Sequence, residues 1–248
     1  MNTQEYERMF RTEDSYWWFI GRHDLVETFI IKQYGTSAHL RILDIGCGTG
    51  AMSTRLSRWG DVISADFSPV ALSYSRKRRL NKLCAADAMH LPFKDASFDL
   101  IVSLDILEHL PDDHAAMKEL YRVLKPGGRL ISTVPAYTSL WSGHDEALMH
   151  QRRYVAREIK RLVEHEGLHI ERLSYAMTFL YPIVAVVRIL TRHSKKPQAS
   201  LVAVSPFVNR ALIGLLKFEN RLIRRFRLPY GVTVFCMAVR PLIDLPAL

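Results

Sequence analysis

The chain has 248 residues, 48% of them hydrophobic and 24% charged, and its formal net charge is +9. These values are those of an ordinary globular protein, and one domain of this length can bury a full α/β core. The three cysteines, Cys47, Cys84 and Cys236, have neither metal-ligand nor redox spacing, which argues against a disulfide framework and suits a reducing cytoplasm. The basic excess predicts an anionic partner, either nucleic acid, a membrane surface or an acidic substrate.

The N-terminal region predicts helices and no targeting segment. Residues 3–34 have a helical pattern, whereas Met1–Asp14 is polar and contains acids, unlike a signal peptide. The longest uncharged stretch, Leu173–Val187, contains Pro182 and is shorter than the roughly 20 apolar residues that cross a bilayer. We therefore expect a cytoplasmic protein without a transmembrane helix.

Helix and strand patterns alternate from Arg41 to Pro135, which predicts βαβ units and a parallel sheet. Right-handed crossovers bring the carboxyl ends of parallel strands to one edge, where we expect a ligand at the switch point. The expected strands are residues 41–45, 61–65, 83–85, 98–104, 128–133, 168–175 and 232–239. The expected helices of the core include residues 51–59, 115–124 and 157–166.

A glycine-rich turn follows the first of these strands. In Ile42–Gly50 a buried apolar strand leads into three glycines, which permit positive φ and close approach of a ligand, and then into a helix whose N-terminus attracts an anion. Asp44 precedes the glycines, and Asp66 ends the next strand, where an acid can accept hydrogen bonds from ribose hydroxyls. Position 51 is Ala, so the third glycine of a dinucleotide fingerprint is missing, which favours one adenosine with an amino-acid tail. A purely structural turn is the alternative.

This turn resembles the first motif of class I S-adenosylmethionine-dependent methyltransferases, in particular their small-molecule (methyltransferase 11/23-like) branch. Ala86-Asp87-Ala88, Phe98–Ser103 and Leu124–Gly128 are similar to later motifs of that family, so the resemblance extends from about Trp17 to Tyr175. It implies S-adenosyl-L-methionine as the cofactor. The implied cofactor-binding residues are Arg22, Asp44, Gly46, Cys47, Gly48, Gly50, Asp66, Phe67, Asp87, Ala88, Ser103 and Leu104.

The resemblance also implies the fold: a Rossmann-like, doubly wound α/β sheet of seven strands, mostly parallel with the last strand antiparallel, and a helical insertion before that last strand. We expect a single methyltransferase domain. Its parts are N-terminal cap helices (residues 1–36), a cofactor-binding core (37–176), a helical lid insertion over the substrate side (177–230), and the last strand and tail (231–248).

Candidate catalytic residues cluster after the fifth strand, in residues 144–154, and this segment resembles one in a subfamily found beside sugar and lipid biosynthesis enzymes. We expect His144 or His150 to remove the acceptor proton, with Asp145 orienting the base. Arg152 or Arg153 is expected to bind an anionic acceptor group. A network of Asp and Arg that only fixes the loop is an equally good interpretation. The candidate catalytic residues are His144, Asp145, His150, Arg153 and Tyr154.

Two further short sequence runs can each be interpreted either as part of a binding site or as purely structural. Asp105-x-x-Glu108-His109 is similar to a run that binds a divalent metal in ubiquinone-pathway O-methyltransferases, but many relatives carry Glu-His without metal, and we expect none. In related sequences the helix that carries Tyr16–Phe19 closes over the cofactor, which implies that Trp18 and Arg22 can touch it. Anchoring of the helix to the core is the alternative; we favour anchoring for Trp17 and cofactor contact for Arg22.

The positive charge concentrates near the expected insertion. At about 100° per residue, Pro206–Arg227 is amphipathic, which fits either a helix on an anionic membrane or a lid helix that packs on the core. We expect Glu219, on its apolar side, to pair with an arginine, and a place in the lining of the substrate cavity is the alternative. The expected apolar face is Val208, Ala211, Leu212, Leu215, Leu222 and Phe226; the basic face is Arg210, Lys217, Arg221 and Arg224, with Arg188, Arg192, Lys195 and Lys196 upstream.

The favoured function is methylation of an oxygen in a small-molecule or lipid-linked acceptor, with peripheral contact to an anionic membrane as a possible addition. An RNA methyltransferase is an alternative, but Ser103-Leu104-Asp105-Ile106 stands where base-directed enzymes carry an Asn/Asp-Pro-Pro-Tyr/Phe motif, so nucleic acid is disfavoured. A non-catalytic cofactor-binding module is the third alternative. The residues do not indicate an oligomeric state.

Overall fold

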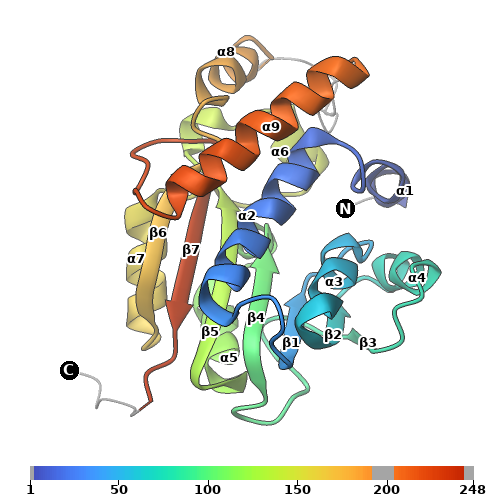
Figure 1. Ribbon diagram of the computed structural model, residues 1–248, viewed down its shortest axis with the longest axis vertical. Coiled ribbons are helices and arrows are strands. Elements are labelled where there is room, and N and C mark those ends of the chain that lie inside the picture. The colour runs from blue at the N-terminus through green and yellow to red at the C-terminus, as the bar shows by residue number, and fades with distance from the viewer. Residues whose placement is uncertain (1–2, 192–203, 243–248) are drawn as a thin grey trace.

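A seven-stranded sheet forms the centre of the computed structural model, which describes residues 3–191 and 204–242 (Figure 1). The strand order is β3-β2-β1-β4-β5-β7-β6, and β7 is antiparallel to both of its neighbours. The strands are β1 (Leu40–Ile45), β2 (Gly60–Asp66), β3 (Leu83–Ala85), β4 (Phe98–Leu104), β5 (Leu124–Pro135), β6 (His169–Ala176) and β7 (Thr233–Val239). The predicted α/β sheet, mostly parallel with its last strand antiparallel, is confirmed.

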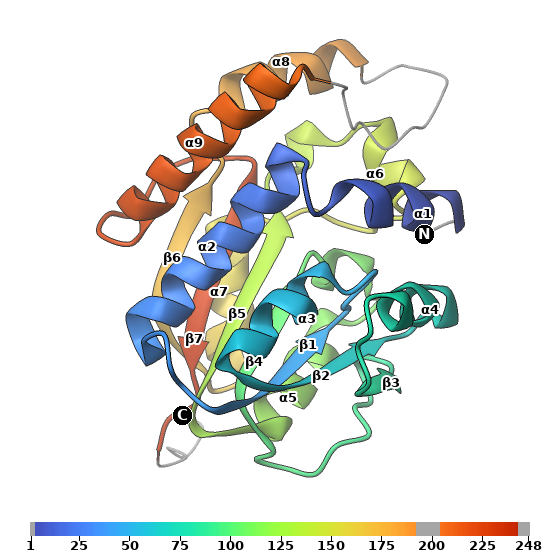
Figure 2. The ribbon, with the colours of Figure 1, turned by 45° about the vertical axis from the view of Figure 1, so that its right-hand side comes forward.

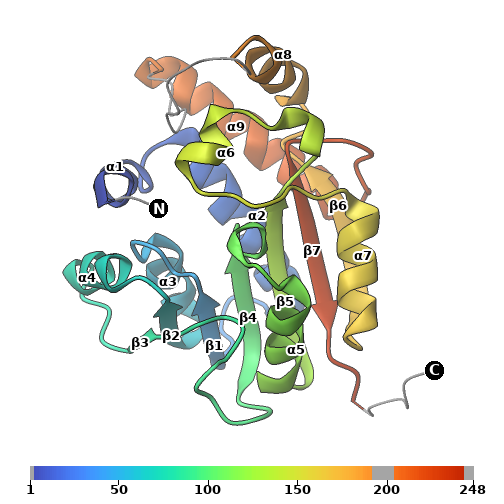
Figure 3. The same ribbon diagram turned by 180° about the vertical axis from the view of Figure 1, so that it is seen from behind.

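Helices cover both faces of the sheet. Helices α2, α3 and α9 lie on the face turned toward the viewer in Figure 1, and α5 and α7 cover the opposite face, seen in Figure 3. The helices are α1 (Thr3–Thr12), α2 (Trp17–Tyr34), α3 (Ala51–Leu56), α4 (Pro69–Lys77), α5 (Asp113–Val123), α6 (Gly143–Ala147), α7 (Ala156–His165), α8 (Tyr181–Thr191) and α9 (Pro206–Ile223), with short 3-10 turns η1 (Ser57–Trp59), η2 (Leu107–His109) and η3 (Thr138–Leu140). Within the described residues no helix is both long and apolar enough to cross a bilayer.

The core has two halves, one on each face, because successive strand residues point to opposite sides. In β1, Ile42 packs in the cluster that contains α2 and α3, whereas Leu43 packs in the cluster that contains α5 and α7. Phe29 of α2 and Phe235 of β7 are fully buried, with ring centroids 4.6 Å apart. Burial of each such side chain contributes roughly 1.5–3 kcal/mol, so both faces hold the sheet that positions the site.

The predicted starts of α5 and β5 differ from those in the structure. Helix α5 begins at Asp113, two residues early, because the Asp112 side chain caps it by accepting a hydrogen bond from the Ala115 amide (2.9 Å). Strand β5 begins at Leu124, four residues early, because the expected breaker at 125–128 forms an irregularity within the β4–β5 pairing instead of ending it.

The face expected to be apolar on α9 is only partly right, because Leu212 and Leu215 do pack against a buried cluster. Leu216, Asn220 and Ile223 are buried, whereas Val208 and Phe226 are 42% and 60% exposed. The Asn220 side chain donates hydrogen bonds to the Gly21 carbonyl and to Asp24 of α2 (both 2.9 Å). A buried polar residue therefore sets the rotation of α9, which a hydrophobic pattern does not reveal.

The expected pairing of Glu219 with an arginine was also wrong within the described residues. Glu219 is fully buried, and its Oε2 accepts a hydrogen bond from the Phe179 amide (2.9 Å) at the turn before α8. Burial raises the pKa of Glu219, and hydrogen bonds from the backbone of residues 177–179 oppose this rise. Glu219 thus ties the two ends of the insertion together. The expected basic residues Arg192, Lys195 and Lys196 lie outside the described residues.

Candidate active site

A cavity of about 800 Å³ opens at the carboxyl edge of the parallel strands. Its walls come from α1 and α2, from the segments that follow each of β1 to β5, from α8 and from the start of β7. Figure 2 shows α1, α6 and α8 gathered above this edge of the sheet. The volume lies within the range of about 300–1,000 Å³ that is typical of small-molecule sites, and the position is the one expected from the strand topology.

The glycine turn forms the base of this cavity. Gly46 and Gly48 have φ of +69° and +56°, and both line the cavity together with Cys47. A Cβ on Gly46 would lie 1.8 Å from Ile106 Cδ1, so the approach of the two loops requires glycine there. Gly50, at φ +87°, precedes α3 and lies outside the cavity lining.

Two acids stand beside the turn. Asp66 accepts hydrogen bonds from the Gly48 amide (2.9 Å) and the Ser68 amide (2.8 Å), and burial raises its pKa. Asp44 is fully buried and accepts a hydrogen bond from the Ser53 hydroxyl (2.5 Å). Burial raises the pKa of Asp44 to about 7. Both carboxylates line the cavity, where they can accept hydrogen bonds from hydroxyl or ammonium groups.

Of five further predicted cofactor residues, four line the cavity and one lies within the sheet. Phe67, 79% exposed, follows Asp66 in the lining, and Asp87 lies nearby with its carboxylate accepting a hydrogen bond from the Met89 amide (2.9 Å). Ala88 and Leu104 also line the cavity. Ser103 is buried within β4 and does not line it.

The N-terminal helices close one side of the cavity. Arg22 of α2 forms an ion pair with Asp105, which follows β4, and Thr133 of β5 donates a hydrogen bond to the other Asp105 oxygen (2.9 Å). Trp17 and Trp18 both line the cavity and both pack against the apolar cluster of the insertion. Trp17 therefore combines the anchoring role expected for it with a place in the wall.

The sequence did not predict that α1 and Glu13, which follows it, contribute to the cavity wall. Tyr6, Met9 and Glu13 line the cavity, and Glu13 also pairs with Arg78 (3.0 Å). Burial raises the pKa of Glu13 to about 7, although the Arg78 guanidinium opposes this. The signal available was the amphipathic pattern of residues 3–12, which indicates a buried face but not what that face covers.

The histidine segment after β5 forms the opposite wall. His144 and His150 line the cavity, and the His150 ring hydrogen-bonds through Nδ1 to Asp145 Oδ1 (2.9 Å). Asp145 is buried and also binds Arg153 Nε (2.7 Å) and the Ser142 amide (2.9 Å). Burial alone would raise the pKa of Asp145, but these hydrogen bonds hold it below its ordinary value. Burial lowers the pKa of His144 to about 3, so this ring is neutral near pH 7.

The arginines near this segment are arranged differently from the expectation. The Arg153 guanidinium is occupied by Asp145 and the Ala136 carbonyl, and Arg152 pairs with Asp113 away from the cavity. Arg153 and Arg188 of α8 both line the cavity, and Arg188 donates a hydrogen bond to the Ser142 hydroxyl (2.5 Å). Burial lowers the pKa of Arg188 to about 10. The sequence indicated Arg188 only as part of the positive charge upstream of α9, and its place in the cavity wall was not predicted.

Tyr154, a candidate catalytic residue, is buried outside the cavity lining. Its hydroxyl donates to Asp113 (2.8 Å) or to the Leu107 carbonyl (3.2 Å). Burial raises the pKa of Tyr154. The side chain therefore connects the histidine segment to η2 and to α5.

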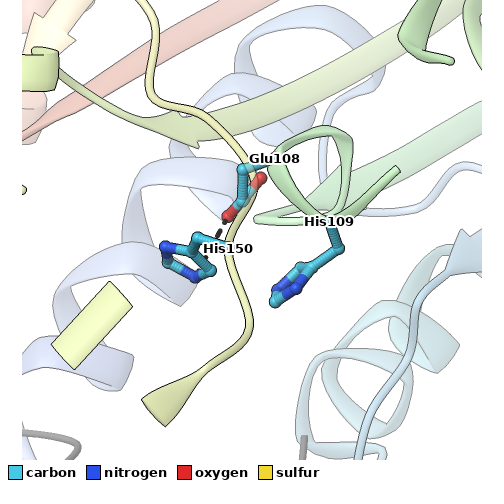
Figure 4. Close-up of side chains that lie close together, drawn as sticks. All are labelled: Glu108, His109 and His150. Atoms are coloured by element: carbon cyan, nitrogen blue, oxygen red, sulfur yellow. Dashed lines mark ion pairs between the residues drawn. The ribbon is translucent and has the colours of Figure 1, made fainter. Parts of the chain in front are cut away.

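Three side chains converge where η2 meets the histidine segment. Figure 4 shows Glu108 and His109 of η2 together with His150, all of which line the cavity. His150 Nε2 lies 4.0 Å from Glu108 Oε1, and the His109 and His150 ring centroids are 4.7 Å apart. Burial raises the pKa of Glu108 well above its ordinary value and lowers that of His109 to about 4. The side chains of the run at 105–109 therefore do not meet at one point, because Asp105 binds Arg22 instead of lying beside Glu108 and His109.

The residues around the turn fit S-adenosylmethionine. A left-handed glycine backbone leaves room for a ligand, and the buried Nε of Arg22 has no hydrogen-bond partner within the described residues. Asp66 and Asp87 offer acceptors on the same side of the cavity as the exposed ring of Phe67. Such a set suits the hydroxyls and the flat, apolar base of an adenosine.

Comparisons with known proteins agree with this geometry. Residues 43–132 match the family described as "Methyltransferase domain". The chain is 39% identical over 121 residues to a demethylmenaquinone methyltransferase from Lactiplantibacillus plantarum, an alignment that covers 44% of this chain and 50% of the relative. The chain spans about half the length of the curated relatives it matches.

Two solved structures share the fold. A chain of the complex between the Haloferax volcanii Trm112 methyltransferase activator and the putative methyltransferase superposes with a TM-score of 0.61 at 20% identity, covering 96% of this chain and 94% of that chain. Phosphoethanolamine N-methyltransferase 2 of Haemonchus contortus, in complex with S-adenosyl-L-methionine, has a TM-score of 0.56 at 23% identity, covering 87% of this chain and 52% of that chain. Residues 43–132 therefore match a methyltransferase domain, and the described chain shares the fold of these solved structures.

Proposed function

We propose that this chain moves a methyl group from S-adenosylmethionine to a hydroxyl group of a small-molecule or lipid-linked acceptor. One observation carries the proposal: a single cavity is lined at the glycine turn by Gly48 and Asp66 and at the opposite wall by His144 and His150. The bound donor supplies an electrophilic methyl group that an acceptor oxygen attacks in line. The protein holds the two reactants in that alignment, which lowers the barrier by several kcal/mol.

The histidine wall supplies the candidate base. A hydroxyl acceptor must lose a proton during the attack, so a neutral imidazole within hydrogen-bond reach assists it. His144 is neutral near pH 7 because of burial, and His150 is oriented by Asp145. These two rings are therefore the candidates for the group that takes the acceptor proton.

Arg188 supplies the candidate anion contact. It comes from α8, in the insertion, and it lines the cavity on the same side as His144. A guanidinium there can bind a phosphate or carboxylate of the acceptor through charge-assisted hydrogen bonds. The relatives named demethylmenaquinone methyltransferases support a small-molecule acceptor.

The test is incubation of the chain with methyl-labelled donor and separated lipid, sugar and RNA fractions. We expect label in the lipid or sugar fraction. His144→Ala and His150→Ala should each lower turnover by about 10²-fold or more while cofactor binding is kept, and His39→Ala, at an exposed residue outside the cavity lining, serves as the control. Label in RNA alone, label in no fraction, or full turnover in both histidine variants contradicts the proposal.

We further propose that the insertion docks on an anionic membrane from which a lipid-linked acceptor is taken. Large apolar side chains on α8 and α9 are exposed, among them Leu190 (79%) and Phe207 (75%). Exposed basic residues accompany them on α9, such as Arg210 and Lys217. Apolar insertion together with attraction of basic residues to anionic lipid is the pattern of peripheral helices, and it accounts for part of the net charge.

Co-sedimentation with vesicles tests this docking. We expect binding to vesicles that contain phosphatidylglycerol, weaker binding to pure phosphatidylcholine, and loss of binding in the double variant Leu190→Asp, Phe207→Asp. Leu242→Asp, at a residue 80% exposed beyond β7, is the matched control. Equal binding of the double variant and the wild type would remove the insertion as the docking surface.

A further inference from the structure

The cluster of Glu108, His109 and His150 has the composition of a metal site. One ligand atom from each side chain can be chosen so that all three lie within 4.8 Å of one another. Glu108 and His109 come from η2, after β4, whereas His150 comes from the segment after β5. Two segments far apart in the chain therefore present one carboxylate and two imidazoles to the same part of the cavity wall (Figure 4).

The state of Glu108 is the observation that requires explanation. The side chain is fully buried, and neither carboxylate oxygen has a hydrogen-bond partner among residues 3–191 and 204–242. A buried carboxylate without a partner is costly, and native structures almost always satisfy such groups by a protein atom, a water or an ion. The ring of His150 is the polar group that faces Glu108, at 4.0 Å, beyond hydrogen-bond reach.

The orientation of His150 points to the same interpretation. Its Nδ1 is hydrogen-bonded to Asp145, which leaves Nε2 turned toward Glu108. Metal-ligating histidines typically donate their second ring N–H to a carboxylate, which fixes the tautomer and the ring plane. Asp145 is itself held by Arg153 and by the Ser142 amide, so it is a positioning residue for the ring.

We propose that Glu108, His109 and His150 bind one divalent transition-metal ion of the Zn²⁺ type. Two imidazoles and one carboxylate form a ligand set suited to Zn²⁺, Co²⁺ or Fe²⁺, in preference to the all-oxygen sets of Ca²⁺ and Mg²⁺. Tetrahedral coordination with bonds of about 2.0–2.2 Å needs ligand atoms about 3.3–3.5 Å apart. Binding therefore draws the three side chains together by rotation about their side-chain bonds.

The proposed ligand set differs from the run at 105–109 because Asp105 is already engaged. Its two oxygens bind Arg22 and Thr133, which leaves η2 to contribute Glu108 and His109. Three protein ligands leave a coordination position open toward the cavity, as in catalytic sites. An acceptor hydroxyl in that position would be acidified by the ion; this role rests on the proposed function, and it leaves His144 as the base.

The experiment measures metal binding directly. The 248-residue chain is stripped with a chelator and titrated with Co²⁺, with visible absorption as the readout, and Zn²⁺ is then added to displace the Co²⁺. We expect one equivalent of Co²⁺ to bind. The bound ion should show the strong visible absorption bands of a site with a low coordination number. Glu108→Gln, His109→Ala and His150→Ala should weaken binding by more than the roughly 10–100-fold that loss of an outer partner costs.

The matched control is His114→Ala. His114, His165 and Glu166 form the other group in the described chain with metal-ligand spacing, and its two histidines are exposed. We expect this variant to bind Co²⁺ like the wild type. Loss of the Co²⁺ bands in His114→Ala, full affinity in both His109→Ala and His150→Ala, or no binding of either ion to the wild type overturns the proposal.

Calorimetry with S-adenosylhomocysteine separates this proposal from the proposed function. Metal-site variants that keep this binding and a cooperative thermal transition are folded, so their loss of Co²⁺ reports on the ligands alone. If the wild type binds S-adenosylhomocysteine but no metal, the metal site fails while the donor site stands. If it binds Co²⁺ through these residues but no S-adenosylhomocysteine, the proposed function fails and the metal site stands.

Discussion

Arg22 of α2 and Asp105, which follows β4, form a part-buried ion pair that joins the N-terminal helices to the carboxyl edge of the sheet. Asp105 has a φ of +54°, a backbone conformation that a non-glycine residue adopts at a cost and that surrounding contacts must maintain. The pair therefore holds both a wall of the cavity and the loop that leads to η2.

Removal of this pair should weaken cofactor binding. We expect Arg22→Ala to raise the dissociation constant for S-adenosylhomocysteine about tenfold, or ~1.4 kcal/mol, because the α2 wall loses its tie to the loop after β4. Arg11→Ala removes an exposed ion pair with Glu7 on α1 and should leave the constant unchanged. Titration calorimetry measures both, and equal constants in the two variants would show that the pair does not support the site.

A methyl group on Gly46 should abolish cofactor binding. The new Cβ would lie 1.8 Å from Ile106 Cδ1, so the Ile106 side chain must move, and the φ of +69° strains any residue other than glycine. Gly35→Ala is the matched control, because Gly35 also has a left-handed φ (+75°) but no atom within 4 Å of the added methyl. The control should lose about 1 kcal/mol of stability and keep its affinity. Retained binding in Gly46→Ala would contradict the assignment of the turn.

Close contact between α2 and α9 depends on Gly21. A Cβ there would lie 2.3 Å from Leu216 Cδ1, so Gly21→Ala should lower the free energy of unfolding by about 1–3 kcal/mol through overpacking. Gly214→Ala, on an open part of α9 with no atom near the added methyl, should raise it by roughly 0.5–1 kcal/mol. Urea denaturation measures the free energy of unfolding of both variants. A change of the same sign in the two variants would contradict the prediction.

Asp44 should make the stability of the chain depend on pH. Its pKa is raised to about 7 in the fold, so the folded chain keeps a proton that the unfolded chain loses near its ordinary pKa. From about pH 5 to about pH 8, the free energy of unfolding should therefore fall by ~2–3 kcal/mol from this group. Asp44→Asn should show a smaller fall than the wild type. Asp61→Asn, at an exposed carboxylate, should show the wild-type fall.

The buried pair of Asp145 and Arg153 should be costly to break. Asp145→Ala leaves the 6% exposed Arg153 without its carboxylate, which should cost about 3–5 kcal/mol in urea denaturation. Asp95→Ala removes an exposed partner of Arg122 and should cost less than about 1 kcal/mol. Comparable losses in the two variants would mean that the histidine segment is not held by this pair.

The residues that line the cavity at the glycine turn were predictable from sequence because they lie close together in the chain. Gly46, Gly48 and Asp66 belong to two consecutive strand–turn units, whose patterns identify both the strands and the turns that follow them. Asp87 ends the third unit. Short-range patterning of this kind fixes where a parallel strand ends, and the sheet then brings these ends together.

Other features depend on contacts between distant segments, which one sequence does not display. The rotation of α9 follows from the hydrogen bonds of Asn220 to α2, and the place of Glu219 follows from the backbone at 177–179. Likewise, the entry of Arg188 into the cavity and the meeting of Glu108 with His150 depend on how the insertion and the histidine segment fold back over the sheet.

The order of the walls along the chain has an evolutionary consequence. The matched domain ends at residue 132, whereas the histidine segment and the insertion lie beyond it. Mutations after Pro135 can therefore reshape what the cavity accepts while the half that grips the donor stays intact. Under the proposed function, a lineage can in this way explore new acceptors without first losing its methyl source.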